Sequence, residues 1–274
     1  RGAARHDLHG AAAAPAASPG ERRVGLFDTA CPAVRARLAR IYGLPRELTD
    51  EGVIAYGFHG LSYAFIAGEL RRLYGETAGG RVVVAHLGSG VSLCGMDPGR
   101  SIATTMGFSA LDGPPMSTRS GALDPGVLLY LMETKGMSAP DLSDLLYRRS
   151  GLLGVSGESG DVRRLQASGS PAAREALDLF VYRVAREIGG LAAALGGIDR
   201  LVFTAGVGEN DPQIRAEILK ACKWLGAELD EGANAQGATR LTTADSAVEG
   251  LVLPTDEQIV IARGALGVLR APNG

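Results

Sequence analysis

Apolar residues along this chain fall into short continuous runs that alternate with longer stretches of helical periodicity. The runs over residues 81–87, 201–205 and 251–253 are short, β-branched and apolar, which is typical of strands covered on both faces. A fourth run, 24–27, stops at Asp28. Strands that alternate with helical patterns to the end of the chain predict an α/β domain.

The predicted helices carry clear start and stop signals. Apolar residues at three- and four-residue spacing predict a long helix over residues 171–195, which two glycines follow. The Asp-Pro pairs at 124–125 and 211–212 predict two helix starts, because Asp caps free N–H groups and proline is tolerated in the first turn. Ser138 followed by Asp141 predicts a capping box for a further helix.

Each of the three buried runs ends in a turn that carries glycines or carboxylates. Gly-Ser-Gly at 88–90 follows the first run, Gly-Val-Gly-Glu-Asn at 206–210 the second, and Pro-Thr-Asp-Glu at 254–257 the third. Glycine lets backbone N–H groups approach an anion, and ligands of open α/β sheets bind at this edge. The repetition predicts a nucleotide or phosphate site.

Two familiar phosphate motifs are absent from the sequence. There is no G-x-x-x-x-G-K-[ST], which argues against a P-loop kinase, and 88–90 lacks the third glycine of the dinucleotide fingerprint. Residues 106–125 form an irregular stretch rich in glycine, proline and serine. A long ordered loop in a compact domain is usually functional, so we expect part of the site there.

Composition and charge limit the possible binding partners of the chain, but they say less about its fold. The chain has 274 residues, of which 46% are hydrophobic and 21% charged, as in soluble globular proteins. A net charge of −2 gives no reason to expect a nucleic-acid or membrane partner, and no run has transmembrane length or a signal-peptide pattern. Three widely spaced cysteines, Cys31, Cys94 and Cys222, predict reduced thiols and a cytoplasmic location.

The chain divides into a short lead-in and one larger unit. Residues 1–23 are of low complexity, and we expect them to be disordered. Residues 24–270 contain no internal repeat and no linker sharp enough to separate two domains. They are therefore expected to form one folded unit.

Three basic side chains are candidates for contacts with phosphate. His86 ends a predicted buried strand, where a core histidine is the alternative, but its place before the Gly-Ser-Gly turn favours a phosphate contact. His59 lies between glycines, which favours an exposed and positioned imidazole. Most arginines are solvated, yet Arg119 in the irregular loop can reach a transferring phosphoryl group with its planar donor fork.

The candidate carboxylates each have a structural alternative. Asp28 ends a strand, where it could serve as a turn or cap residue. Glu257 precedes an apolar helix predicted over 259–269, so it is either a favourable charge at a helix N-terminus or a Mg²⁺ contact. Asp161 and Arg163 form a loop ion pair or hold a nucleoside.

Together these segments resemble the acetate kinase (acetate/propionate kinase) family, in family order and spacing over residues 24–266. The matching segments are FDTA at 27–30, GFHG at 57–60, HLGSG at 86–90, TMGFSALDG at 105–113, TRSGALDP at 118–125, RSGLLGVSG at 149–157, FTAGVGEN at 203–210 and PTDEQ at 254–258. The resemblance implies a ribonuclease-H-like (actin-like ATPase) domain, with a mixed sheet flanked by helices. In that family ATP lies in a cleft between two such domains.

The resemblance also implies reversible transfer of the ATP γ-phosphoryl group to acetate or another short carboxylate, giving acetyl phosphate and ADP. It implies Mg²⁺ or Mn²⁺ as cofactor and a homodimer. By the family pattern Asp28, His59 and Arg119 are catalytic, and Glu257 contributes to the metal site. The nucleotide would be held by His86, Leu87, Gly88, Ser89, Gly90, Asp161, Val162, Arg163, Gly206, Val207, Gly208, Glu209 and Asn210. A loose transition state needs charge stabilisation more than a protein nucleophile.

The chain also departs from the family pattern. Ser89 replaces an asparagine, Tyr63 replaces an imidazole, and Ser117 replaces a glycine, which is expected to narrow a close backbone approach. The family's N-terminal strand and N-x-G-S-S-S loop do not occur, so we expect most of the N-terminal domain to be missing. The alternative function is a non-catalytic remnant that binds nucleotide or dimerises. Kinases of butyrate or sugars are a third candidate, which the loops at 86–90 and 118–125 disfavour.

Overall fold

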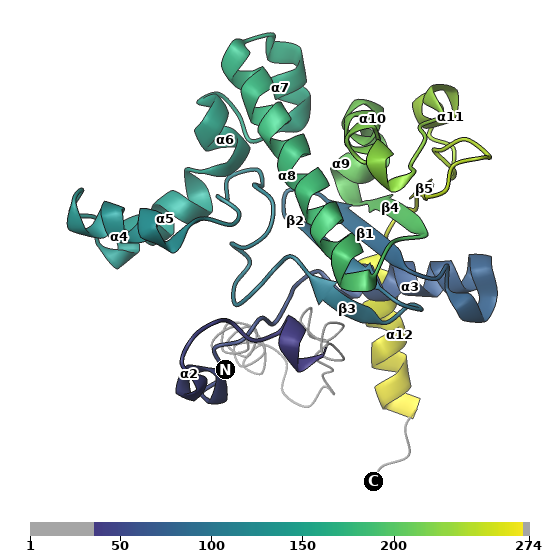
Figure 1. Ribbon diagram of the computed structural model, residues 1–274, viewed down its shortest axis with the longest axis horizontal. Helices are drawn as coiled ribbons and strands as arrows, with labels where there is room; N and C mark the ends of the chain where they lie inside the picture. Colours follow the sequence, from purple (N-terminus) through teal and green to yellow (C-terminus); the bar gives the residue numbers. More distant parts are fainter. Residues whose placement is uncertain (1–35, 271–274) are drawn as a thin grey trace.

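A five-stranded mixed sheet forms the centre of the computed structural model, which describes residues 36–270 (Figure 1). The predicted strand at 24–27, the candidate Asp28 and the lead-in at 1–23 lie outside the described residues. The strands follow the order β3-β2-β1-β4-β5, in which β4 and β5 are parallel to β1 while β2 and β3 are antiparallel neighbours. Their bounds are β1 (Val82–Leu87), β2 (Val91–Met96), β3 (Ser101–Thr104), β4 (Arg200–Thr204) and β5 (Glu249–Val252).

The sequence predicted β1, β4 and β5, but it missed the two strands that follow β1. The chain turns back through residues 88–90, where Gly88 N donates to Gly90 O at 3.1 Å, and then forms β2 and β3 without an intervening helix. The expected alternation of strands with helices is therefore wrong between β1 and β3. Serine, cysteine and glycine interrupt the apolar pattern of β2, and β3 has only 4 residues, so neither stands out as a run.

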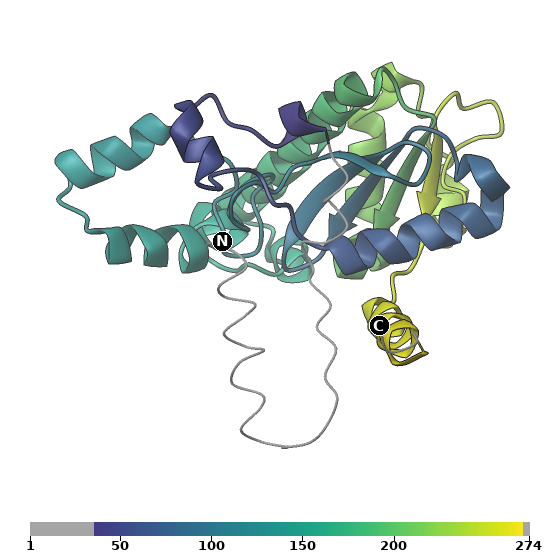
Figure 2. The same cartoon turned by 90° about the horizontal axis from the view of Figure 1, so that it is seen from below.

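Helices cover both faces of the sheet, as the continuous apolar run of β1 predicted. Every side chain of β1 is buried, and alternate residues point to opposite faces because side chains of a strand alternate. Val83 and Ala85 pack in a core with α8 (Pro171–Leu195), whereas Val82 and Val84 pack in a second core with α3 (Gly60–Tyr74). Figure 2 shows α3 and α8 on opposite sides of the sheet.

The long helix α8 has the bounds that its periodicity predicted. Ser170 Oγ accepts a hydrogen bond from Ala173 N at 3.0 Å at one end, and Gly196 adopts a left-handed conformation with φ 69° at the other. Its apolar residues, among them Phe180 and Val184, are buried in the first core. The apolar face of α8 is therefore core and is not available as an interface.

The predicted helix starts are also confirmed. Asp124 caps α4 by accepting from Gly126 N, Asp211 caps α10 by accepting from Ile214 N, and Ser138 with Asp141 forms the capping box of α5. Helices α4 and α5 project away from the sheet as a pair (Figures 1 and 2). The remaining helices are α2 (Arg46–Asp50), α4 (Pro125–Glu133), α5 (Ala139–Arg148), α6 (Gly151–Ser156), α7 (Val162–Ser168), α9 (Ala205–Asn210), α10 (Pro212–Ala221), α11 (Glu231–Ala235) and α12 (Glu257–Arg270).

The structure bears on the predicted state of the cysteines and on the length of the apolar helices. Cys94 and Cys222 are buried and free, as predicted, and burial raises the pKa of the Cys222 thiol to about 12. Cys31 lies outside the described residues. Within the span 36–270, no helix combines the length and the apolarity that crossing a membrane requires.

Candidate active site

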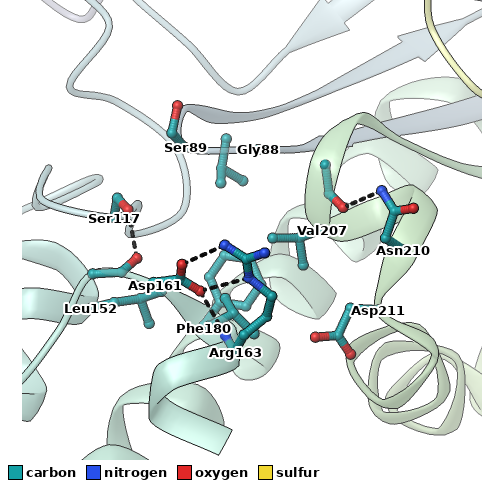
Figure 3. Close-up of a pocket in the computed structure, with 14 residues that line it drawn as sticks. Gly88, Ser89, Ser117, Leu152, Asp161, Arg163, Phe180, Val207, Asn210 and Asp211 are labelled. Atoms are coloured by element: carbon teal, nitrogen blue, oxygen red, sulfur yellow. Dashed lines mark hydrogen bonds and ion pairs between the residues drawn. The ribbon is translucent and has the colours of Figure 1, made fainter.

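A pocket of about 430 Å³ opens where β1 and β4 end side by side (Figure 3). The turn after β1 forms one wall and the start of α9 forms another, so two of the three predicted turn segments border one pocket, whereas the third, at 254–257, does not line it. The pocket is lined by Gly88, Ser89, Val91, Ser117, Leu152, Gly160, Asp161, Val162, Arg163, Phe180, Gly206, Val207, Asn210 and Asp211. Apolar side chains, glycines and a few polar or charged side chains line this space, as is typical of small-molecule and cofactor sites.

The segment at 206–210 is a short helix, α9, where the sequence predicted a glycine turn. The sharp change of direction falls one residue earlier, at Ala205, whose φ is 65°. Gly206 is helical, and a Cβ added there would meet no atom within 4 Å, so it leaves open space beside the backbone. The side chain of Asn210 closes the helix by donating to Gly206 O at 2.9 Å (Figure 3).

The carboxylate of Glu209 links two strand ends and does not line the pocket. Its Oε1 accepts from Ala205 N at 2.7 Å and from Thr255 N at 3.1 Å. This oxygen therefore ties α9 to the segment after β5, which leads to Glu257 at the start of α12. Gly208 is buried against the backbone of Phe203, where an added Cβ would lie 3.4 Å from the carbonyl carbon.

A buried arginine, which the sequence analysis did not single out, supports α9 from beneath. Arg215 is 1% exposed, and its Nη1 donates to Gly208 O at 3.0 Å and to Glu209 O at 2.8 Å. Its Nε donates to Asn234 Oδ1 at 2.9 Å. Burial lowers the pKa of Arg215, and the carbonyl groups at the end of α9 stabilise its charge. Arg215 thus fixes the position of one pocket wall.

Asp161 and Arg163 form the ion pair that was one of the two sequence interpretations. Arg163 Nη2 lies 2.7 Å from Asp161 Oδ2, and Asp161 also caps α7 by accepting from Arg163 N at 2.9 Å. The hydrogen bond from Arg163 holds the pKa of Asp161 at about 2. Both residues line the pocket (Figure 3). Val162 also lines it and packs in the first core. A ligand would therefore meet a preformed ion pair.

Ser117 joins two walls of the pocket. The sequence predicts that its side chain, which replaces a glycine of the family pattern, reduces the space between backbone segments. Its hydroxyl donates to Gly160 O at 2.5 Å, and its N–H donates to Ser89 O at 3.4 Å. Gly160 is needed there because an added Cβ would lie 2.6 Å from Ser117 O. The added side chain of Ser117 thus holds the loop before α7 against the irregular loop.

His59 and Arg119 meet at Gly90, beside the pocket. An added Cβ at Gly90 would lie 3.1 Å from His59 Nε2 and 3.6 Å from Arg119 Nη1, so both side chains approach this backbone closely and a larger residue would press on His59. Arg119 Nη1 donates to Ala110 O at 3.3 Å, and no carboxylate in the span 36–270 forms an ion pair with it. His59 precedes α3 in a left-handed conformation with φ 58°. A non-glycine residue is held there only by its surroundings.

His86 stacks on His59 behind the turn. The ring centroids are 4.1 Å apart with an interplanar angle of 17°. His86 Nδ1 is hydrogen-bonded to Ser62 Oγ at 2.8 Å, and its Nε2 lies 3.6 Å from the Cβ position of Gly88. Burial, and secondarily the neighbouring His59, lowers the pKa of His86 to about 3. His86 is therefore neutral at neutral pH and faces the turn as the buried member of a stacked pair, while His59 is half-buried.

Leu87 and Glu257 lie apart from the pocket. Leu87 is buried in the first core, so only its backbone is near the turn. Glu257 begins α12 and is not among the pocket-lining residues. Within the span 36–270, no three His, Cys, Asp or Glu residues are grouped as a metal site. A single carboxylate still fits Mg²⁺, which is commonly held by one or two carboxylates together with phosphate oxygens and water.

The buried, neutral His86 makes stability depend on pH. Its pKa is about 3 in the fold against 6.5 for an ordinary histidine, so between these values the unfolded chain binds the proton more readily. The stability due to neutral His86 is complete above the ordinary pKa and is lost as pH falls towards the lower value. Relative to His86→Asn, the wild-type chain should lose about 1 kcal/mol of unfolding free energy per pH unit over this window. Urea titrations at several pH values measure this, and parallel losses in both proteins would contradict it.

Comparisons with known proteins agree with this arrangement. The family model described as the acetokinase family matches residues 4–263. The chain is 56% identical over 248 residues to an acetate kinase of Rhodopseudomonas palustris (strain TIE-1), covering 89% of this chain and 62% of that protein. It is 54% identical over 256 residues to an acetate kinase of Rhizobium meliloti, covering 93% and 65%. The chain thus spans just under two thirds of the length of these relatives.

Solved structures give the same result for the fold. The crystal structure of Porphyromonas gingivalis acetate kinase superposes with a TM-score of 0.88 at 35% identity, covering 96% of this chain and 68% of that chain. A propionate kinase from Francisella tularensis gives a TM-score of 0.88 at 32% identity, covering 94% and 67%. These matches confirm the predicted mixed-sheet, actin-like ATPase fold. The chain belongs to the acetokinase family.

Proposed function

We propose that this chain is the nucleotide-binding part of an acetate kinase, which transfers the γ-phosphoryl group of ATP to acetate or another short carboxylate and gives ADP and an acyl phosphate. The observation that supports this most is one pocket shared by the turn after β1 and the start of α9. His59 and Arg119 meet at Gly90, the far end of that turn. The names of the relatives agree with this activity.

Different parts of the pocket suit different parts of a nucleotide. Val207 is half-buried and, together with the more deeply buried Leu152 and Val162, gives the pocket an apolar lining that suits the base. In the turn at 88–90 the N–H group of Gly88 is bonded to Gly90 O, so Ser89 and Gly90 supply the backbone N–H groups that suit phosphate oxygens, and Gly90 has no Cβ in the way. A nucleotide bound with its base at this apolar surface would direct its phosphates along the turn towards Gly90.

At Gly90 the protein offers donors for a transferring phosphoryl group. Arg119 has a fixed positive charge, and His59 directs Nε2 to the same backbone position. Phosphoryl transfer passes through a loose transition state, so donors placed around the equatorial oxygens lower the barrier. The attacking carboxylate is ionised at neutral pH and needs no strong base. By the family pattern, Asp28 completes this centre, although it lies outside the described residues.

Glu257 is the residue we propose for Mg²⁺, or Mn²⁺ in its place. The bond network of Glu209 holds the segment that leads to Glu257 against α9. When bound, the metal would neutralise phosphate charge. We place the activity in the cytoplasm, where buried free thiols such as Cys94 and Cys222 stay reduced.

One observation keeps a second function open. The chain spans just under two thirds of the relatives' length, so the residues present here could bind nucleotide or dimerise without turnover. A single wall of a cleft does not orient both substrates, and poor alignment alone costs orders of magnitude in rate. Binding and turnover are therefore tested separately.

Binding is tested at Gly206, where a side chain has room in the protein but would occupy the pocket. Gly206→Val should weaken ADP binding at least about tenfold, roughly 1.4 kcal/mol, because the added methyl groups exclude the ligand from the backbone. Gly190→Val in α8 is the matched control, since a Cβ there also meets no atom within 4 Å and lies outside the pocket. Isothermal titration calorimetry measures both. Equal affinities for the two variants, or no ADP binding by the wild-type chain, would refute the site.

Turnover is tested at Arg119 in a protein that joins this chain to the part of a relative that it does not cover. Arg119→Ala should lower kcat at least about tenfold, because the transition state loses a charged donor. Arg148→Ala is the control, since the Arg148 side chain is 81% exposed on α5. Trapping the acyl phosphate with hydroxylamine gives the rates. A joined wild-type protein that binds ADP and makes no acyl phosphate would favour the non-catalytic function.

We propose that the homodimer forms through α4. The apolar face of α8 is buried in the core, whereas α4 has no buried residue and exposes Leu129 by 56% and Tyr130 by 49%. The double variant Leu129→Glu/Tyr130→Glu should sediment as a monomer. Forming the dimer would remove water from the two introduced carboxylates, and this loss of hydration opposes association. Trp224→Glu is the control, because Trp224 is 70% exposed elsewhere. A dimer that survives the α4 changes, or dissociates only with the Trp224 change, would place the interface elsewhere.

A further inference from the structure

One carboxylate oxygen of Glu209 accepts hydrogen bonds from two backbone segments that lie far apart in the sequence. Glu209 Oε1 lies 2.7 Å from Ala205 N and 3.1 Å from Thr255 N. Thr204 Oγ1, which is fully buried, donates to the same oxygen at 3.4 Å. Glu209 itself is half-buried and does not line the pocket, although the family pattern includes it among the residues that hold the nucleotide. Its carboxylate therefore has another role.

This oxygen takes the place of a backbone acceptor where the pairing of β4 with β5 ends. Leu253 N donates to Phe203 O at 3.0 Å, just beyond the end of β5. Parallel ladders are evenly spaced, so the next bond in this register would run from Thr255 N to Ala205 O. At Ala205, however, the chain turns away into α9, and Thr255 N donates to Glu209 Oε1 instead. The side chain thus extends the ladder by one hydrogen bond.

The turn at Ala205 is unfavourable for an L-residue and needs support. Its φ is 65°, a left-handed conformation in which Cβ crowds the backbone. Its methyl group faces the turn after β1, since a Cβ added at Gly88 would lie 3.6 Å from Ala205 Cβ. Such conformations persist only where surrounding contacts hold them. Of the three bonds to Glu209 Oε1, the shortest comes from Ala205 N, so the carboxylate supports the turn directly.

We propose that Glu209 is a positioning residue that couples the pocket wall to the segment after β5 through one carboxylate oxygen. The bond from Ala205 N acts on the wall, because Gly206 is the next residue and lines the pocket. The bond from Thr255 N acts on the segment that leads to Glu257 at the start of α12. The consequence for phosphoryl transfer rests on the proposed function, whereas the two hydrogen bonds are a property of the folded chain.

Two substitutions separate the role of the acceptor oxygen from the role of the charge. Glutamine keeps a carbonyl oxygen on a side chain of the same length, so Glu209→Gln should keep both bonds. Methionine is of similar size and has no oxygen, so Glu209→Met should lose both. If the negative charge of Glu209 acted on a ligand or metal directly, the two substitutions would be equally harmful. Glu228→Met is the matched control, because Glu228 is exposed.

Amide hydrogen exchange, followed by NMR, measures the two bonds without any ligand. Glu209→Met should speed the exchange of Ala205 N–H and Thr255 N–H at least about tenfold, whereas Glu209→Gln should change it by less than about threefold. Leu253 N–H is the internal control, because it donates to Phe203 O and should exchange at the wild-type rate. An equal acceleration at Leu253 would indicate general destabilisation and contradict the proposal. Unchanged exchange at Ala205 and Thr255 in the methionine variant would also overturn it.

The coupling is tested with ADP, because the segment after β5 does not line the pocket. In the wild-type chain, ADP should slow the exchange of Thr255 N–H at least about threefold. Glu209→Met should bind ADP at least about tenfold more weakly in calorimetry. Adding Ala205→Gly should restore most of this affinity, because glycine adopts the left-handed turn without support. It should not restore the ADP-dependent protection of Thr255, since the second bond is still absent.

The opposite results in this experiment have clear meanings. An affinity that Ala205→Gly does not restore, or Thr255 protection that returns with it, would refute the coupling through Glu209. Where Glu209→Met does not fold, the wild-type chain decides, because ADP that binds without protecting Thr255 N–H also refutes it. A wild-type chain that binds no ADP would refute the proposed function. The exchange contrast between Glu209→Met and Glu209→Gln in the free chain would still decide the positioning role.

Discussion

The parallel pairing of β1 with β4 is the constraint on which the rest of the structure depends. Val82 to His86 lie opposite Arg200 to Thr204, so the two strands end at the same level of the sheet. Helices cover both faces, which leaves the strand ends as the place where backbone groups reach a pocket. Because of this register, the turn after β1 and the helix after β4 begin at the same edge of the sheet and border the same pocket.

Features that look unrelated in the sequence keep that edge open and rigid. Gly90 makes room for His59 and Arg119, and Gly160 makes room for the backbone of Ser117. Arg215 holds α9 from below through the carbonyl groups of Gly208 and Glu209. A buried cation is costly to desolvate, and here the carbonyl groups of α9 and the nearby charge of Asp211 offset that cost, so removing Arg215 would leave these carbonyl groups without their donor.

Patterns of local origin could be predicted from the sequence. The buried strands followed from continuous apolar runs, α8 followed from its periodicity, and the helix starts at Asp124 and Asp211 followed from capping chemistry. Their physical causes act within a few residues, so the sequence contains them. The motifs that resemble the acetokinase family extended this to the fold and to the segments that form the pocket.

Features that depend on distant contacts were not predictable. The hairpin of β1 and β2 places Ser92 directly opposite His86, and α3 then crosses to bring Tyr63 to the same serine. In the sequence, Ser92 could be noticed only because it follows closely after the 88–90 turn, and this spacing is informative only if the turn is assumed to belong to a hairpin. For Arg215, an arginine within an apolar helix pattern looks like any solvated arginine. Its role depends on Asn234 and α9 meeting in space.

The most direct test of the central claim is a crystal structure of the chain with ADP. The account predicts base density against the apolar lining of the pocket at Leu152 and Val207, and phosphate oxygens in contact with the N–H groups of Ser89 and Gly90. It also predicts that Gly206 lies against the ligand and that α9 stays where Arg215 holds it. ADP bound at another face of the sheet, or phosphates directed away from Gly90, would contradict the account.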